Sequence, residues 1–118
     1  MSTILDIEGR TALVTGAGQG VGRQVALYLA EHGAGAVVIN DFHADRAESV
    51  AAEVEAAGAK ALPIAFDVSN FEAVGAAFAE AQSAFGGVDI LVNNAGNAGT
   101  TSRLDDLVPF SDSDPSEW

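Results

Sequence analysis

The sequence predicts an α/β fold in which a doubly wound parallel sheet is covered on both faces by helices, giving three layers. Short apolar segments alternate along the chain with segments whose apolar residues recur at helical spacing. The short segments are apolar almost throughout, which is typical of strands buried on both faces of a parallel sheet. Glycine, aspartate or asparagine follows each of them, at the edge where such sheets bind ligands.

Two strand–helix units are expected in the first part of the chain. Residues 11–14 (TALV) and 36–40 (AVVIN) are short and apolar, so both are expected to be buried strands. A helix should follow each strand, and these helices should end at Gly33 and Gly58. Apolar stripes at helical spacing define the buried faces: Val21, Val25, Ala26, Leu29 and Ala30 in the first helix, and Ala47, Val50, Ala51 and Val54 in the second.

A third unit and a fourth strand complete the pattern. Residues 62–66 (LPIAF) are expected to form the third strand, with Pro63 at its start or on the edge of the sheet. Ser69 and Glu72 match the S-x-x-E capping box and so predict the N-terminus of a third helix. Residues 90–92 form the fourth expected strand. The third helix should end at Gly86-Gly87 and bury Val74, Ala77, Phe78, Ala81 and Phe85.

Right-handed crossovers in a doubly wound sheet place these strands in the spatial order 3-2-1-4. Residues 1–96 are interpreted as the first half of a larger domain, because the fourth strand would otherwise be an unpaired edge. Residues 97–118 are polar and acidic, and are expected to form a loop that leads into a further helix before the chain is truncated. This loop is either a lid or specificity loop beside a substrate site or a solvated surface loop.

Composition narrows the classes of function. The chain of 118 residues has a formal net charge of −12, so it lacks the basic face that binding to nucleic acid or to an anionic membrane requires. The absence of cysteine excludes disulfides and thiolate metal sites, and no histidine and acidic residues have metal-ligand spacing. No signal peptide or apolar membrane span is visible, so a cytoplasmic location is the default expectation.

A glycine cluster at residues 15–22 (TGAGQGVG) lies between the first strand and the first helix. Backbone N–H groups at a helix N-terminus favour a phosphate group. Gly16 would permit the sharp turn, Gly20 the close approach of a pyrophosphate, and Gly22 the packing of helix on strand. The cluster lacks the lysine of a P-loop and departs from the G-x-G-x-x-G pattern. A glycine-rich packing turn is the alternative interpretation.

Asp41 follows the second strand, roughly 20 residues after the cluster. A carboxylate there can accept hydrogen bonds from the adenosine ribose hydroxyls and would repel a 2′-phosphate. The neighbouring Phe42 and His43 supply no arginine to offset that repulsion. The sequence therefore predicts binding of NAD(H) in preference to NADP(H). An ordinary role in a turn or a helix cap is the alternative for Asp41.

Three motifs together resemble the N-terminal half of the short-chain dehydrogenase/reductase (SDR) family: TGAGQGVG at 15–22, DV at 67–68 and NNAG at 93–96. This resemblance implies a Rossmann-type fold that binds NAD(H). It implies that the pyrophosphate and ribose lie against Gly16, Gln19, Gly20 and Val21, the adenosine ribose against Asp41, the adenine against Asp67 and Val68, and the central part of the cofactor against Asn94, Ala95 and Gly96. Gly22 and Phe42 complete the predicted set of cofactor-binding residues.

The family's chemistry implies hydride transfer between the nicotinamide and a ketone or secondary alcohol, with a 3-oxoacyl thioester among the candidates. Relatives use a serine, and a tyrosine with a lysine four residues later, and neither Tyr28 nor Lys60 fits that arrangement. No catalytic residue is therefore assigned to this chain, and the missing half of the fold or a second chain is expected to supply them. The resemblance also implies a homo-oligomeric parent. Two alternatives stay open: a stand-alone dinucleotide-binding module without catalysis, and a methyltransferase that uses S-adenosylmethionine.

Overall fold

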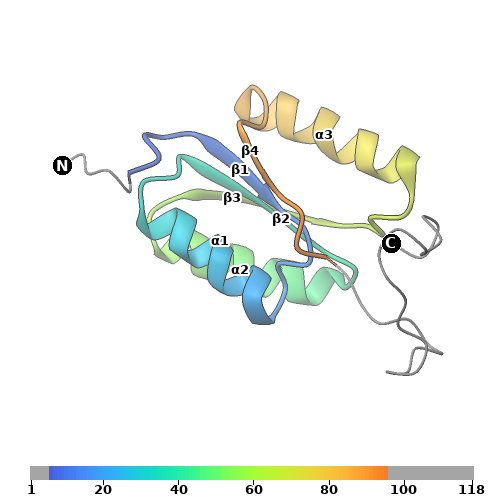
Figure 1. The fold of residues 1–118 in the computed structure, drawn as a ribbon, viewed down its shortest axis with the longest axis horizontal. Coiled ribbons are helices and arrows are strands. Elements are labelled where there is room, and N and C mark those ends of the chain that lie inside the picture. Colours follow the sequence, from blue (N-terminus) through green and yellow to red (C-terminus); the bar gives the residue numbers. More distant parts are fainter. Residues whose placement is uncertain (1–5, 96–118) are drawn as a thin grey trace, which may run out of the picture.

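The structure, a computed structural model, describes residues 6–95, and Figure 1 shows how they are arranged. Strands and helices alternate along this range, as predicted. The expected loop at residues 97–118, together with Gly96, lies outside the described residues. In chain order the elements are β1 (Thr11–Val14), α1 (Gly20–Glu31), β2 (Ala36–Asp41), α2 (Ala44–Ala56), β3 (Lys60–Ala65), α3 (Phe71–Phe85) and β4 (Ile90–Val92).

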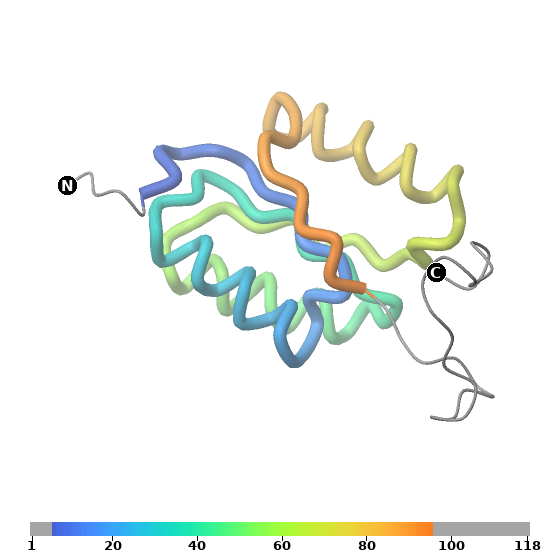
Figure 2. The backbone as a smooth tube through the Cα atoms, viewed as in Figure 1, coloured from blue at the N-terminus to red at the C-terminus, as the bar shows by residue number. Residues whose placement is uncertain are grey.

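The four strands form one parallel sheet with the order β3-β2-β1-β4, which confirms the predicted order 3-2-1-4. Thr11 and Val14 of β1 lie opposite Ala36 and Ile39 of β2. α1 and α2 lie on one face of the sheet and α3 lies on the other, so three layers are present (Figures 1 and 2). Because all strands run in the same direction, their carboxyl ends meet at one edge, where open sheets of this kind bind ligands.

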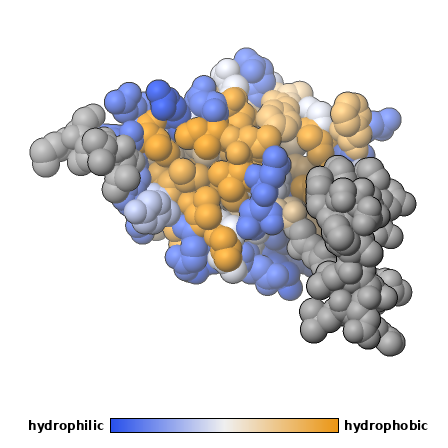
Figure 3. Space-filling view, in the orientation of Figure 1, coloured by the Kyte–Doolittle hydropathy of each residue, from blue (hydrophilic) through white to orange (hydrophobic). Residues whose placement is uncertain are grey.

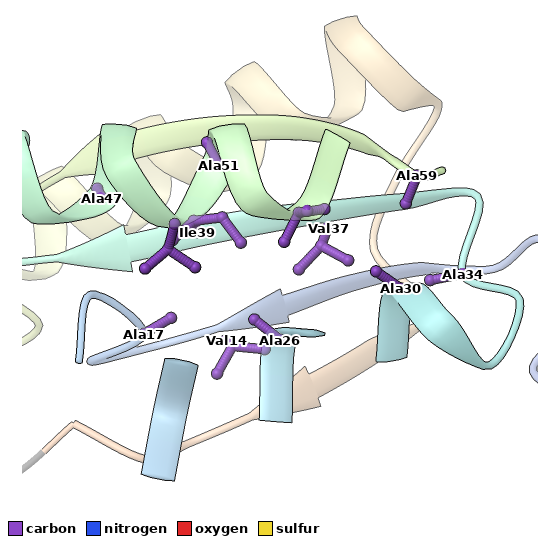
Figure 4. Packing of buried hydrophobic residues seen from close by; sticks show 12 residues of the cluster. Val14, Ala17, Ala26, Ala30, Ala34, Val37, Ile39, Ala47, Ala51 and Ala59 are labelled. Carbon is purple, nitrogen blue, oxygen red and sulfur yellow. The ribbon is translucent and has the colours of Figure 1, made fainter. Parts of the chain in front are cut away.

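The larger part of the core lies between the sheet and the helices α1 and α2 (Figure 4). Val37 and Ile39 of β2 belong to this cluster, together with alanines from both helices. Alanine adds little bulk, so the helices can approach the sheet closely. α2 buries all four residues of its predicted stripe: Ala47, Val50, Ala51 and Val54.

The buried stripe of α1 is narrower than the sequence predicted. Its buried residues are Gly22, Ala26 and Ala30, with Val25 and Leu29 half-buried beside them. Val21, by contrast, is 71% exposed, because it lies in the first turn on a side of α1 that no other described element covers. Arg23 in the same turn forms a two-pronged ion pair with Glu53 of α2, with Nε 3.0 Å from Oε1, and this pair links the two helices.

α3 covers the opposite face more thinly than predicted. Its buried residues are Ala77 and Ala81, and Ala81 packs with Leu13 and Val38 of the sheet. Phe78, which was expected in the buried face, is 37% exposed. Of the described helices, α3 alone lies on this face, so only the stripe that points directly at the sheet is enclosed. Two further residues of the predicted face are half-buried: Val74 and Phe85.

Two strands are longer than predicted because backbone hydrogen bonds extend them. β3 begins at Lys60 rather than residue 62, since the Lys60 N–H donates to the Gly35 carbonyl oxygen at 3.0 Å beside the first paired residues. β2 continues through Asp41, which pairs with Ala65. Pro63 lies inside β3, and its missing N–H is tolerated because β3 is an edge strand of the described sheet, as predicted.

The N-terminus of α3 is capped by Asn70 rather than by Ser69. The Asn70 Oδ1 accepts a hydrogen bond from the Ala73 N–H at 3.1 Å, which satisfies one of the unpaired donors of the helix. The Ser69 hydroxyl instead donates to the Asp67 carboxylate at 2.7 Å. The predicted capping box is therefore wrong, because a neighbouring acid competes for the serine.

Candidate functional site at the carboxyl ends of the strands

The turn after β1 is built around glycines in the left-handed region. Gly16 and Gly20 have φ angles of +61° and +58°, which residues with a Cβ rarely adopt. The Ala17 N–H donates to the Asn40 carbonyl oxygen at 2.7 Å and holds the turn against the end of β2. The chain thus leaves the sheet sharply and reaches the N-terminus of α1 within a few residues.

Gly16, Gly20 and Gly22 differ in what surrounds them. A Cβ at Gly22 would lie 2.3 Å from the Gly16 carbonyl oxygen and 2.5 Å from the Asn94 Nδ2. A Cβ at Gly16 would lie 2.8 Å from the Ala95 Cα. At Gly20 the same space is open, with no described atom within 4 Å. Gly16 and Gly22 therefore allow the turn, the helix and the end of β4 to pack, whereas Gly20 leaves bare backbone accessible.

The N-terminus of α1 carries unpaired backbone donors. Its N-cap residue, Gln19, makes no side-chain hydrogen bond to the helix, and no acidic residue lies in the first turn. α3, by contrast, is capped by Asn70 and has Glu72 in its first turn. The first N–H groups of α1 and the positive end of its dipole are therefore available to an anionic group. Gln19, Gly20 and Val21 are exposed around them.

Asp41 lies beside this turn and has only 6% of its surface exposed. Its Oδ1 accepts a hydrogen bond from the Gly18 N–H at 3.1 Å, and its Oδ2 accepts one from the His43 N–H at 3.0 Å. A Cβ at Gly18 would lie 2.6 Å from the Asp41 Cγ, so glycine permits this contact. A carboxylate has about four acceptor sites, so each oxygen retains one. Phe42, the next residue, is 67% exposed.

The end of β4 is tied to the same turn. The Thr15 Oγ1 accepts hydrogen bonds from the backbone N–H groups of Asn94 and Ala95, both at 3.0 Å. The Asn94 Nδ2 in turn donates to the Gly16 carbonyl oxygen at 3.2 Å. These contacts bring three residues of the predicted site into one cluster: Gly16, Asn94 and Ala95.

Asp67 and Val68 follow β3 at this edge of the sheet. The Asp67 Oδ1 accepts hydrogen bonds from the Ser69 hydroxyl at 2.7 Å and from the Ser69 N–H at 2.9 Å. The hydroxyl, and after it the N–H, hold the pKa of the Asp67 carboxyl below its ordinary value. The carboxylate is thus ionised at neutral pH and is bound within the turn formed by residues 67–69. Val68, the next residue, is 42% exposed.

Three residues outside the predicted set hold the site together: Thr15, Gly18 and Asn40. Thr15 binds β4, Gly18 binds the Asp41 carboxylate, and Asn40 contacts the ends of both neighbouring strands. For Thr15 and Asn40 the available signal was a polar residue at a buried position in or beside an apolar strand, because a buried polar group needs hydrogen-bond partners. For Gly18 it was only its place in the glycine cluster.

Comparison with known proteins shows the family to which this chain belongs. The sequence pattern of the family described as short chain dehydrogenase matches residues 10–118. The chain belongs to the short-chain dehydrogenase family. This confirms the resemblance carried by the glycine cluster and the two shorter motifs, and it removes the methyltransferase alternative.

Three short-chain dehydrogenase relatives illustrate the likeness. Subunit BbsD of the hydroxy(phenyl)methylsuccinyl-CoA dehydrogenase of Thauera aromatica is 43% identical over 102 residues, which are 85% of this chain and 41% of that protein. An L-rhamnose 1-dehydrogenase (NAD(P)(+)) of a Sphingomonas species is 45% identical over 91 residues, 76% of this chain and 35% of its own length. A solved structure of 7α-hydroxysteroid dehydrogenase, complexed with NADH and 7-oxo glycochenodeoxycholic acid, has a TM-score of 0.76 at 40% identity and covers 80% of this chain. The match covers 37% of that structure, so the chain spans about two fifths of the length of these relatives.

The single tyrosine and the single lysine of this short-chain dehydrogenase chain lie away from the glycine turn. Tyr28, in the C-terminal half of α1, is 55% exposed and stacks on the His32 ring with centroids 4.0 Å apart. Lys60 begins β3, at the amino ends of the strands. Within residues 6–95, no three histidine or acidic side chains are grouped to hold a metal ion. No helix in that range has the length and apolar character needed to cross a membrane.

Proposed function

We propose that this chain is the NAD(H)-binding portion of an oxidoreductase that transfers hydride between the nicotinamide and a ketone or secondary alcohol. One observation carries the proposal: the uncapped, acid-free N-terminus of α1 follows the glycine turn, and the Asp41 carboxylate binds that same turn from the neighbouring strand end. A dinucleotide needs N–H donors for its pyrophosphate and an acceptor for its ribose. Membership of the family, and the NADH bound to a solved relative, support the proposal.

Each part of the dinucleotide has residues that fit it. In this proposal the pyrophosphate meets the first N–H groups of α1, where Gly20 leaves the backbone bare. The ribose hydroxyls donate to Asp41, and Phe42, Asp67 and Val68 border the adenine. When bound, the nicotinamide accepts or supplies the hydride, and the residues of this chain bind and orient the cofactor. The remaining proposed contacts are Gly16, Gln19, Val21, Gly22, Asn94, Ala95 and Gly96.

The proposed preference for NAD(H) over NADP(H) depends on the charge of Asp41. A 2′-phosphate beside this carboxylate would experience Coulomb repulsion that is stronger at a partly buried site than in water. The N–H groups of Gly18 and His43 offset part of the negative charge, so we expect discrimination between the cofactors rather than exclusion of NADP. The name of the L-rhamnose 1-dehydrogenase relative includes both cofactors.

The proposed substrate is a small carbonyl compound or alcohol. The named relatives include dehydrogenases of a CoA thioester, a sugar and steroids, so a 3-oxoacyl thioester is one candidate among several. We further propose that the rest of the fold pairs with β4, where Leu91 is 48% exposed. A homo-oligomeric parent and a cytoplasmic location stay predictions, the first of which light scattering on the full-length protein would test.

Isothermal titration of the full-length protein with NAD, NADP and S-adenosylmethionine tests the proposal. We expect NAD to bind more tightly than NADP, and S-adenosylmethionine to give no heat of binding. Secondary alcohols from the steroid, sugar and hydroxyacyl thioester classes are then added, and reduction of NAD is followed by the absorbance of NADH. Failure of both nicotinamide dinucleotides to bind would contradict the proposal. Binding of NAD without turnover of any alcohol would favour a dinucleotide-binding module without catalysis.

A further inference from the structure

Asn40 is a polar residue inside the sheet, with 1% of its surface exposed. It follows three apolar residues of β2, Val37, Val38 and Ile39, which are also fully buried. A buried amide destabilises a protein unless its donors and acceptor have partners. No polar side-chain atom buried within residues 6–95 lacks a partner, and those of Asn40 are satisfied by backbone groups.

The Asn40 side chain spans the two strands that flank β2. Its Oδ1 accepts a hydrogen bond from the Gly16 N–H at 3.3 Å, on the β1 side. Its Nδ2 donates to the carbonyl oxygens of Phe66 at 3.1 Å and Ile64 at 3.3 Å, on the β3 side. Gly16 and Phe66 lie just beyond the ends of β1 and β3. The amide therefore adds side-chain hydrogen bonds to the backbone pairing, which runs through Asn40 and Asp41, at the point where these strands separate.

Each side of this contact leads directly into the proposed cofactor site. Gly16 begins the turn that precedes the free N–H groups of α1, and Phe66 immediately precedes Asp67 and Val68. Side chains alternate between the faces of a strand. Asn40 therefore points to the α3 face, as Val38 does, whereas Asp41 points to the opposite face. Asn40 therefore lies on the face of β2 opposite Asp41, the residue proposed to bind the ribose.

We propose that Asn40 is a positioning residue that holds the pyrophosphate turn and the adenine segment in a fixed relation across β2. The inference rests on the proposed binding of a dinucleotide at this edge. Asparagine is suited to the position because one planar amide carries both an acceptor and two donors. Leucine has a similar volume and neither group, and the single hydroxyl of threonine is too short to reach both neighbouring strands.

The test is Asn40→Leu in the full-length protein, with Val54→Ala as the control. Val54 is fully buried in the last turn of α2, which lies at the opposite end of the strands, so its truncation lowers thermal stability without a contact to the site. Both variants are titrated with NAD well below their unfolding temperatures. We expect NAD affinity to fall about tenfold in Asn40→Leu and to stay unchanged in Val54→Ala. Equal losses of affinity in the two variants would overturn the proposal.

Amide hydrogen exchange without ligand gives a second readout that does not depend on cofactor binding. In Asn40→Leu we expect protection to fall together at Gly16 and at residues 67–70, and in Val54→Ala we expect protection at both segments to be retained. Unchanged exchange at both segments in Asn40→Leu would also overturn the proposal. Failure of the unmodified protein to bind NAD would contradict the proposed function instead. If Asn40→Leu does not fold, Asn40→Thr is measured in the same two ways, with losses in the same direction expected.

Discussion

At the scale of single residues, the proposed cofactor preference depends on Asp41. Asparagine at this position keeps an acceptor oxygen for one of the two backbone N–H groups and removes the negative charge. We expect Asp41→Asn to weaken NAD binding and to raise the affinity for NADP relative to NAD by about tenfold, because the repulsion of the 2′-phosphate disappears. Isothermal titration of the full-length variant with both cofactors measures this ratio.

A nearby acid provides the control for this measurement. Asp45 lies in the first turn of α2 and is exposed, so Asp45→Asn removes the same charge without removing a contact to the glycine turn. We expect the NADP-to-NAD ratio of Asp45→Asn to match that of the unmodified protein. The same change of ratio in both variants would show that the general charge of this region, and not Asp41, sets the preference.

Alanine substitutions at two glycines of the turn should lower the free energy of unfolding by different amounts. Gly20→Ala should lower the free energy of unfolding by about 1–2 kcal/mol, because a Cβ is strained in the left-handed region but meets open space. Gly22→Ala should lower it by more, because its Cβ would overlap the Gly16 carbonyl oxygen. Urea denaturation measures both values.

Gly75→Ala is the matched control for these two variants. Gly75 lies inside α3 with no described atom near its Cβ position, so alanine should stabilise the protein by up to about 1 kcal/mol through helix propensity. A larger loss in Gly20→Ala than in Gly22→Ala would contradict the packing at the turn. A loss in Gly75→Ala would show that the α3 surface is covered by other parts of the protein.

The sequence could identify some site residues and not others for a physical reason. The glycines are needed for a sharp turn, and Asp41 is an acid at the end of a strand. Both features depend on nearby sequence and therefore appear as short motifs. Gly18 and Asn40 act on partners 23 to 26 positions away in sequence, and Thr15 on partners 79 and 80 positions away. Those partners are set by the register of the parallel strands, which no short motif reveals.

At the scale of elements, the cap of α3 is the clearest difference from the sequence prediction, and it can be tested. Asn70→Ala should lower the free energy of unfolding by about 1 kcal/mol, because the Ala73 N–H loses its partner. Ser69→Ala should have a smaller effect, because the hydroxyl bonds to an exposed carboxylate and not to the helix. Urea denaturation of the two variants compares them directly, and a larger loss in Ser69→Ala would restore the capping box.

All seven elements could be predicted because each has a clear pattern of apolar residues. The width of the buried stripe of α3 could not be predicted. Periodicity identifies the side of a helix that faces the sheet, but the width of the buried stripe depends on what lies beside the helix. Ala77 and Ala81 are enclosed by the sheet itself, whereas Phe78 would need a neighbouring helix to be enclosed. The start of β3 was missed because a lysine is unusual in a strand and is acceptable here only at an exposed edge.

At the scale of the whole molecule, the face that carries α1 and β4 is largely apolar (Figure 3). A depression of about 660 Å³ lies along α1 and is lined by Gly20, Val21, Arg23, Gln24, Val25, Tyr28 and Leu29. Apolar surface of this kind marks an interaction site or promotes association. Because the chain spans about two fifths of the length of its relatives, we expect other parts of a longer protein to cover this face.

This expectation predicts opposite effects of one substitution in two contexts. Residues 1–118 expressed alone should self-associate, and Tyr28→Lys or Leu91→Lys should reduce that association, because each adds charge to the exposed apolar face. In the full-length protein the same substitutions should lower thermal stability, because each would then place a charge in a covered contact.

Phe71→Lys is the control, since Phe71 lies on α3 across the sheet and is 89% exposed. Light scattering follows the association and thermal denaturation follows the stability. Neutral effects of Tyr28→Lys and Leu91→Lys in the full-length protein would show that this face stays open to solvent, and the rest of the fold would then have to pack elsewhere.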